Sequence, residues 1–149
     1  STTPHYVYRY VPGKTATLRS SQAVAPPNAP RRVLAAIAAG NRIAGKPYVY
    51  GGGHGCAEAS GYDCSGATSY ILRAAGLLDG PAETSHGFRH YGSSGEGKWI
   101  TIYAIKGHVF LSVAGLRFDT GWGDKHTGPQ WTTRRRTAEG AVLRHPPGL

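Results

Sequence analysis

The sequence predicts an α+β domain in which helices come first and a small antiparallel β-sheet follows. Apolar residues recur at helical spacing between residues 30 and 75, and from Trp99 onward the hydrophobic period changes to two. Hydrophobic residues make up 40% of the 149-residue chain, which is enough to bury a core and excludes wholesale disorder. We therefore expect one domain over residues 29–149, preceded by a lead-in over residues 1–28.

The lead-in is rich in Ser, Thr, Pro and Ala, and its last four residues, Ala-Pro-Pro-Asn, are typical of a turn or linker. Polar and apolar residues alternate from His5 to Val11, which favours an edge strand. The sequence leaves open whether the lead-in blocks a functional groove.

The first helix is expected over residues 30–44. Asn28 is the predicted N-cap, and Pro30 suits the first turn because its φ angle is already helical. Gly45 and then Pro47 are expected to end the helix.

A second helix is expected to begin near Cys64 and to end before Gly76. Residues 77–98 contain Gly, Pro, Ser and charged residues and predict a long surface loop, a kind of segment that is often functional. The apolar stripe of this second helix consists of Ala67, Tyr70, Ile71 and Ala74.

Strands are expected over residues 99–103 and 108–113 because apolar and polar residues alternate there. Ala114 and Gly115 predict a two-residue hairpin turn, and residues 116–119 are expected to form the second strand of that hairpin. A last strand is expected at residues 141–143.

The chain carries 17 Lys and Arg residues against 8 Asp and Glu residues, a formal net charge of +9. Such a surface associates with polyanions, which include nucleic acid, anionic lipid and cell-wall polymers. Arg134–Arg136, Arg144 and His145 are expected to form a solvated basic face. Because no recognisable nucleic-acid-binding motif accompanies this face, we expect anionic cell-wall polymers as partners and no nucleic acid.

Two cysteines are too few for a disulfide scaffold, and no run of roughly 18 apolar residues predicts a membrane span. The chain contains no Met and begins with Ser1. We therefore expect a processed, secreted, monomeric protein whose signal peptide has been removed.

Cys64 lies in the segment Tyr62–Gly66, where a loop becomes the second expected helix. Unpaired N–H groups and the helix dipole at such a position stabilise a thiolate and make the sulfur nucleophilic. The same N–H groups can stabilise the oxyanion of a tetrahedral intermediate. An arbitrary cysteine is more often a small buried residue, but the flanking Asp63 and Ser65 favour a nucleophile here.

His108 is the candidate base. If Ala114 and Gly115 form a two-residue turn, Asp119 lies opposite Phe110 and is the diagonal neighbour of His108. Diagonal pairs are about 7–8 Å apart, within reach of an imidazole and a carboxylate. Asp119 is therefore expected to orient His108 as the third member of a catalytic triad; a turn one residue longer or shorter would remove it from that face.

Three segments, Pro47–Gly52, Gly61–Gly66 and Gly107–Val109, resemble the NlpC/P60 cysteine peptidases of bacterial cell walls. The resemblance covers about residues 29–121 and implies a papain-like core in which Cys64 attacks and His108 acts as base. The family's third residue is usually a His, and Asp119 stands in its place here.

The resemblance also implies a substrate and further site residues. It implies cleavage of peptidoglycan stem peptides between D-γ-glutamyl and the following diamino acid, without metal or cofactor. Tyr48 matches the tyrosine whose hydroxyl points at the nucleophile, whereas Tyr50 is expected to be a packing residue. Asp63 and Ser65 are expected to contact the free amine of a stem peptide, although helix capping explains them equally well.

Cys56, eight positions before Cys64, allows three interpretations: a disulfide that silences the enzyme, a zinc site with His54, Cys64 and His108, or an inert thiol. His86 and His90 in the long loop are weaker candidates for substrate contact.

Two other functions remain open at this stage. One is a silent or repurposed fold that binds anionic wall polymer or nucleic acid. The other is acyl transfer to an amine instead of water.

Overall fold

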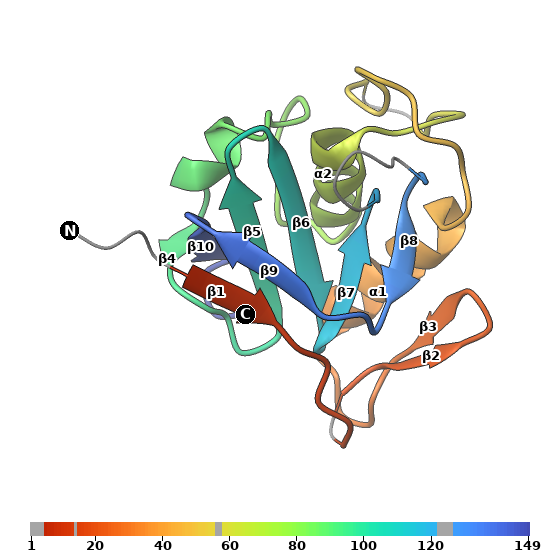
Figure 1. Ribbon diagram of the computed structural model, residues 1–149. Coiled ribbons are helices and arrows are strands. Elements are labelled where there is room, and N and C mark those ends of the chain that lie inside the picture. The colour runs from red at the N-terminus through yellow and green to blue at the C-terminus, as the bar shows by residue number, and fades with distance from the viewer. Residues whose placement is uncertain (1–4, 14, 56–57, 122–126) are drawn as a thin grey trace.

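A six-stranded antiparallel sheet with strand order β4-β10-β5-β6-β7-β8 forms the centre of the structure (Figure 1). The structure is a computed structural model and describes residues 5–13, 15–55, 58–121 and 127–149. It confirms a mixed α+β fold with antiparallel sheets. The elements are β1 (His5–Tyr8), β2 (Thr17–Arg19), β3 (Gln22–Val24), α1 (Arg31–Ile43), α2 (Cys64–Ala74), the 3-10 helix η1 (Gly87–His90), β4 (Ser93–Ser94), β5 (Ile100–Ile105), β6 (His108–Val113), β7 (Leu116–Asp119), β8 (Gln130–Thr132), β9 (Arg136–Glu139) and β10 (Val142–His145).

The helices α1 and α2 pack against one face of the sheet, and their apolar side chains form the larger core with those of β5, β6 and β7. Both helices occur where the sequence predicts them, but the predicted N-cap of α1 is wrong. Pro30 is the N-cap and makes no side-chain capping bond. Asn28 instead has a φ of 65°, so it forms a left-handed turn two residues before the cap position.

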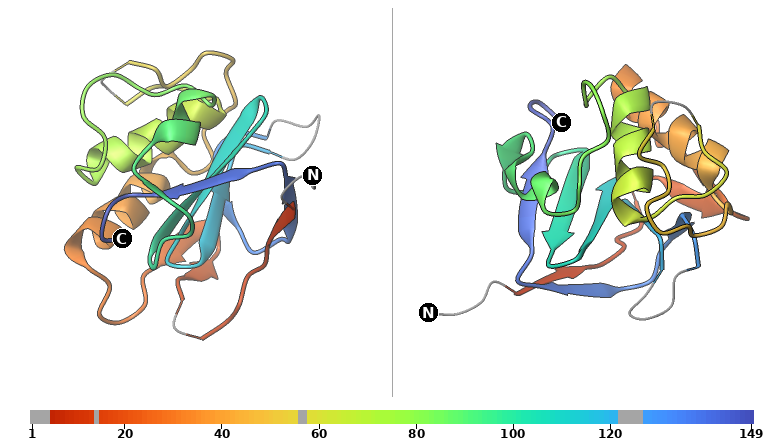
Figure 2. Two further views of the ribbon diagram at one scale, coloured as in Figure 1. Left: turned by 90° about the vertical axis from the view of Figure 1, so that its left-hand side faces the viewer. Right: turned by 90° about the horizontal axis from the view of Figure 1, so that it is seen from above.

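The opposite face of the sheet is covered by a two-stranded ribbon of β1 and β9 (Figure 2, right). Beneath this ribbon lies a second, smaller core that includes Tyr8, Tyr103 and Phe110. Strands β5, β6 and β7 are therefore buried on both faces, even though their sequences alternate as they would in a sheet with one exposed face.

The N-terminal segment contributes strands to this structure. The expected edge strand forms over His5–Tyr8 and pairs with β9. The β2–β3 hairpin then packs against α1, where the Asn41 side chain accepts from the Ala23 N–H at 2.8 Å and donates to its carbonyl at 3.0 Å. Tyr8 and Ala23 are buried, so the described part of residues 1–28 is packed onto the rest of the fold.

Residues 77–98 are more ordered than the expected surface loop. They contain η1 and β4, and Phe88 is fully buried in the larger core. Tyr91 also packs against this core, so two aromatic residues anchor a segment whose glycine and serine content predicted a loop. The expected last strand is confirmed as β10, and no helix among the described residues is long and apolar enough to cross a bilayer.

Candidate active site

Cys64 is the first residue of α2, as the sequence predicts. The side chain of Asp63 is the N-cap, and its Oδ1 accepts a hydrogen bond from the Gly66 N–H at 2.7 Å. The Ala67 N–H bonds to the Asp63 carbonyl. The N–H groups of Cys64 and Ser65, in the first turn, have no partner within the helix and lie at the positive end of its dipole, beside the thiol.

A glycine-rich loop lies directly against this end of α2. The Asp63 N–H donates to the Gly52 carbonyl at 3.1 Å. A Cβ atom on Gly53 would lie 2.3 Å from the Tyr62 ring, and one on Gly66 would lie 2.1 Å from the Gly52 carbonyl oxygen. Glycine is therefore required at these contacts, and the close packing fixes the backbone around the nucleophile.

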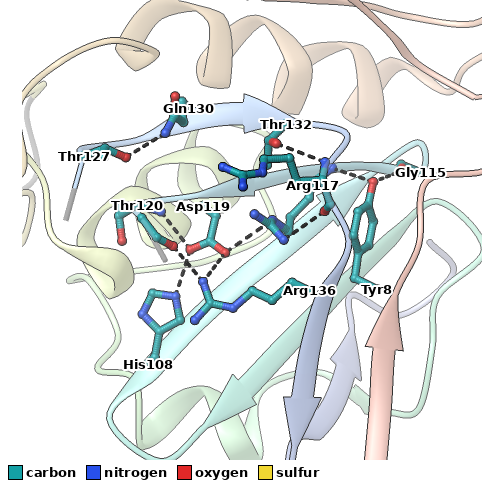
Figure 3. A network of polar contacts seen from close by, with 12 residues as sticks. Tyr8, His108, Gly115, Arg117, Asp119, Thr120, Thr127, Gln130, Thr132 and Arg136 are labelled. Carbon is teal, nitrogen blue, oxygen red and sulfur yellow. Dashed lines mark hydrogen bonds and ion pairs between the residues drawn. The ribbon is translucent and has the colours of Figure 1, made fainter. Parts of the chain in front are cut away.

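His108 and Asp119 face each other across the β6–β7 hairpin (Figure 3). Val113 pairs with Leu116, as expected for a two-residue turn. Ala114 and Gly115 have φ angles of 50° and 83°, as the two central residues of a type I′ turn require. The hairpin brings His108 Nε2 to 2.8 Å from Asp119 Oδ1.

The pKa of His108 is raised above its ordinary value, which favours the imidazolium form at neutral pH. Burial lowers its pKa, but hydrogen bonds to Asp119 and to Cys64 outweigh burial and raise the pKa from 6.5 to about 9. Because Nε2 is bonded to Asp119, Nδ1 is the ring nitrogen that remains for the contact with Cys64. The structure therefore brings three predicted residues together: Asp119 is hydrogen-bonded to His108, and the His108 ring lies close enough to Cys64 for the two groups to interact electrostatically.

Asp119 has further partners that the sequence analysis missed. Its side chain is only 2% exposed. Arg136 Nη1 lies 2.8 Å from its Oδ2, Arg117 Nε lies 3.4 Å from the same oxygen, and the Thr120 N–H donates to Oδ1 at 2.8 Å (Figure 3). Arg117 stands two positions before Asp119 on the same strand and shares its face, a spacing that could have identified it. Arg136 comes from β9, and no local signal relates it to Asp119.

Cys64 opens onto a cleft of about 480 Å³. Tyr48 lines this cleft, and its pKa is raised by burial and by the charges of Cys64 and Asp63, which places the phenol near both. None of the described residues of the lead-in lines the cleft, so within that part the N-terminal segment does not block it. The lining residues are Tyr48, Tyr50, Gly51, His54, Asp63, Cys64, Ser65, Thr84, Ser85 and Gly107.

Tyr50 is not the packing residue expected from the sequence. It is 92% exposed and lies at the rim of the cleft, because the turn that follows Val49 directs it away from the core. Tyr62 is the aromatic residue that packs in the core beside the site: it is fully buried, and its hydroxyl accepts the Ala59 N–H at 2.7 Å.

Asp63 and Ser65 form a polar wall of the cleft together with His54. His54 Nε2 lies 2.9 Å from Asp63 Oδ1 and 3.1 Å from Ser65 Oγ. Asp63 Oδ2 also accepts the Gly51 N–H at 3.1 Å. The capping role of Asp63 is thus clear in the structure, and His54 is a cleft residue that the sequence analysis considered only as a zinc ligand.

The expected basic face is only partly solvated. Arg134 and Arg135 are exposed, but the Arg136 side chain is 11% exposed and points at Asp119. Arg144 donates to the carbonyls of Tyr91 and Gly92, so it holds the segment before β4 against β10 and is not a free cation. A run of arginines in the sequence did not distinguish these two roles.

The zinc and disulfide interpretations of Cys56 concern a residue outside the described part of the chain. Among the described residues, no group of three or more His, Cys, Asp or Glu side chains is placed to hold a metal ion. His86 and His90 contact each other, with ring centroids 6.0 Å apart, and do not line the cleft.

Comparison with known proteins adds no relative. No protein-family model and no curated protein sequence matches this chain.

Proposed function

We propose that the protein is a cysteine peptidase of the NlpC/P60 type, with a papain-like core, that hydrolyses peptidoglycan stem peptides. The observation that carries the proposal is the grouping of Cys64 with the hydrogen-bonded pair His108–Asp119 beside an open cleft. A thiol at a helix N-terminus, beside a histidine that a buried carboxylate orients, is the arrangement of an activated nucleophile.

The first half-reaction forms an acyl-enzyme. The Cys64 thiolate attacks the carbonyl carbon of a stem-peptide bond, and the electron pair of the C=O bond moves to oxygen. The N–H groups of Cys64 and Ser65, with the Tyr48 hydroxyl, stabilise this oxyanion. When it collapses, the C–N bond breaks and the His108 imidazolium gives its proton to the leaving amine.

The second half-reaction restores the enzyme. Neutral His108 accepts a proton from water as the water oxygen attacks the thioester carbon. The C–S bond then breaks, which releases the carboxylic acid and regenerates the thiolate and the imidazolium. Asp119 keeps the ring oriented through both steps and does not react.

The substrate part of the proposal rests on the sequence resemblance, which implies the bond between D-γ-glutamyl and a diamino acid. The polar wall of His54, Asp63 and Ser65 supplies groups for a polar peptide, and the net charge of +9 favours retention on an anionic wall. We accordingly propose that the protein is secreted and acts at the cell wall.

Digestion of purified peptidoglycan with identification of the fragments by mass spectrometry tests this function. We expect cleavage within the stem peptide by the parent protein and none by Cys64→Ser at equal folding. Wall binding without cleavage by both proteins would instead indicate a binding module. Products that incorporate an added amine in place of water would indicate an acyltransferase.

Alkylation gives an independent test of the nucleophile. In a Cys56→Ser background, iodoacetamide at about pH 6 is expected to modify Cys64 and to abolish cleavage, because the thiolate is the reactive form. His108→Gln is the matched control, and its thiol is expected to react more slowly at that pH. Equal reactivity of Cys64 in both proteins would contradict the proposed thiolate–imidazolium pair.

A further inference from the structure

The two oxygens of the Asp119 carboxylate have separate sets of partners. Oδ1 accepts from His108 and from the Thr120 N–H. Oδ2 accepts from Arg136 at 2.8 Å and lies 3.4 Å from Arg117 Nε. The guanidinium groups thus hold one carboxylate oxygen, and the other oxygen, which the Thr120 N–H also contacts, faces His108.

Arg136 is itself held in place from several directions. It is the first residue of β9 and pairs with Tyr8 of β1. Its Nη1 also donates to the Gly121 carbonyl at 2.7 Å, and its guanidinium lies over the Phe110 ring, 5.1 Å from the centroid. Arg136 thus ties the end of β7 to the ribbon that covers the sheet.

We propose that Arg136 is a positioning residue for catalysis: it clamps Asp119 Oδ2 so that Oδ1 holds His108 in line with Cys64. This proposal rests on the proposed function for its catalytic meaning. It also assigns a function to the N-terminal strand, because β1 is the strand that pairs with β9 at Arg136.

Positioning by Arg136 and a simple charge effect of Arg136 predict changes of opposite sign in the pKa of His108. If Arg136 acted only as a nearby positive charge, its removal would stabilise the imidazolium and raise the pKa of His108. If Arg136 positions Asp119, its removal lets the carboxylate rotate away, weakens the bond to His108, and lowers the pKa of His108 from about 9 toward 6.5.

The experiment is an NMR titration of the His108 ring in the full chain, with its signal assigned among the seven histidines by His108→Gln. We expect Arg136→Met to lower the pKa of His108 by about one unit or more. Arg135→Met, which removes an exposed neighbouring charge, is the matched control and is expected to leave the pKa of His108 within a few tenths of a unit, about the scale of a screened surface charge. An unchanged or raised pKa in folded Arg136→Met would overturn the proposal.

Arg136→Lys decides the matter if Arg136→Met does not fold. Lysine keeps the charge but cannot make the same planar contacts, so positioning predicts a lowered pKa of His108, whereas a charge effect predicts no change. The titration needs no substrate. Failure of the parent protein to cleave peptidoglycan, together with a lowered pKa of His108 in the variants, would therefore refute the proposed function alone. Cleavage by the parent protein, together with an unchanged pKa of His108 in the variants, would refute the positioning proposal alone.

Discussion

Asp119 and His108 are diagonal neighbours on the β6–β7 hairpin, and a hydrogen bond of 2.8 Å joins Oδ1 of the first to Nε2 of the second. This relationship depends on turn length. One residue more or fewer between β6 and β7 would transfer Asp119 to the helix-covered face of the sheet. The I′ turn at Ala114 and Gly115 therefore determines the geometry of the site as well as the hairpin.

Asp119→Asn is expected to slow peptidoglycan cleavage without abolishing it. The amide keeps the shape of the side chain but removes the charge that raises the pKa of His108. We expect a loss of about 10- to 100-fold in kcat, below the contribution of a group that itself transfers the proton. Steady-state kinetics with a soluble stem peptide measure this loss. A kcat equal to that of the parent would show that Asp119 has no part in catalysis.

The pH dependence of the reaction follows from the raised pKa of His108. Below about pH 9 the ring is an imidazolium and can protonate the leaving amine, and above that pH this proton is lost. We expect kcat/KM to fall as the pH rises through about 9 in the parent protein. In Asp119→Asn the same decline is expected at lower pH, and a decline at the same pH in both proteins would contradict the assignment.

The same shift has a consequence for stability. Because folding raises the pKa of His108, the ionised ring stabilises the fold fully below about pH 6.5, and this contribution is lost as the pH rises through about 9. Relative to His108→Gln, the parent is expected to lose an amount of stability on the order of 3 kcal/mol between these two pH limits. Urea unfolding of both proteins below pH 6.5 and above pH 9 measures the difference, which should shrink at the higher pH.

Sequence reasoning predicted the parts of the site that depend on local rules. The helix start at Cys64 follows from a short polar cap residue before an apolar period, and the contact of His108 with Asp119 follows from a two-residue turn. Arg136 could not be predicted in this way, because its place depends on the pairing of β9 with a strand more than a hundred residues earlier. Tyr50 was wrongly predicted to pack in the core, because the alternation of polar and apolar residues does not show where a strand ends.

The glycine loop beside α2 gives a prediction about stability with a built-in control. Gly51 and Gly53 both have positive φ angles, of 74° and 84°. A Cβ atom on Gly51 would meet nothing within 4 Å, whereas one on Gly53 would lie 2.3 Å from the Tyr62 ring. Gly51→Ala is expected to cost about 1–2 kcal/mol of unfolding free energy from backbone strain alone.

Gly53→Ala is expected to cost at least about 1 kcal/mol more than Gly51→Ala, because strain and overpacking add there. Denaturant unfolding of the two variants measures this difference. Equal losses would mean that the loop moves freely against Tyr62 and does not fix the backbone at Cys64.

The exposed ring of Tyr50 is expected to contact substrate. A tyrosine that is 92% exposed at the rim of a cleft leaves a large apolar surface in water, and covering that surface with part of a peptide or sugar would be favourable. Tyr50→Ala should therefore raise KM by roughly 5- to 30-fold, the effect of losing about 1–2 kcal/mol of binding free energy, with little change in kcat.

Val11→Ala is the matched control, since Val11 is 66% exposed and does not line the cleft. An increase in KM confined to Tyr50→Ala would place substrate on this rim, whereas a fall in kcat at constant KM would show that the ring acts on the chemistry at Cys64 and not on binding.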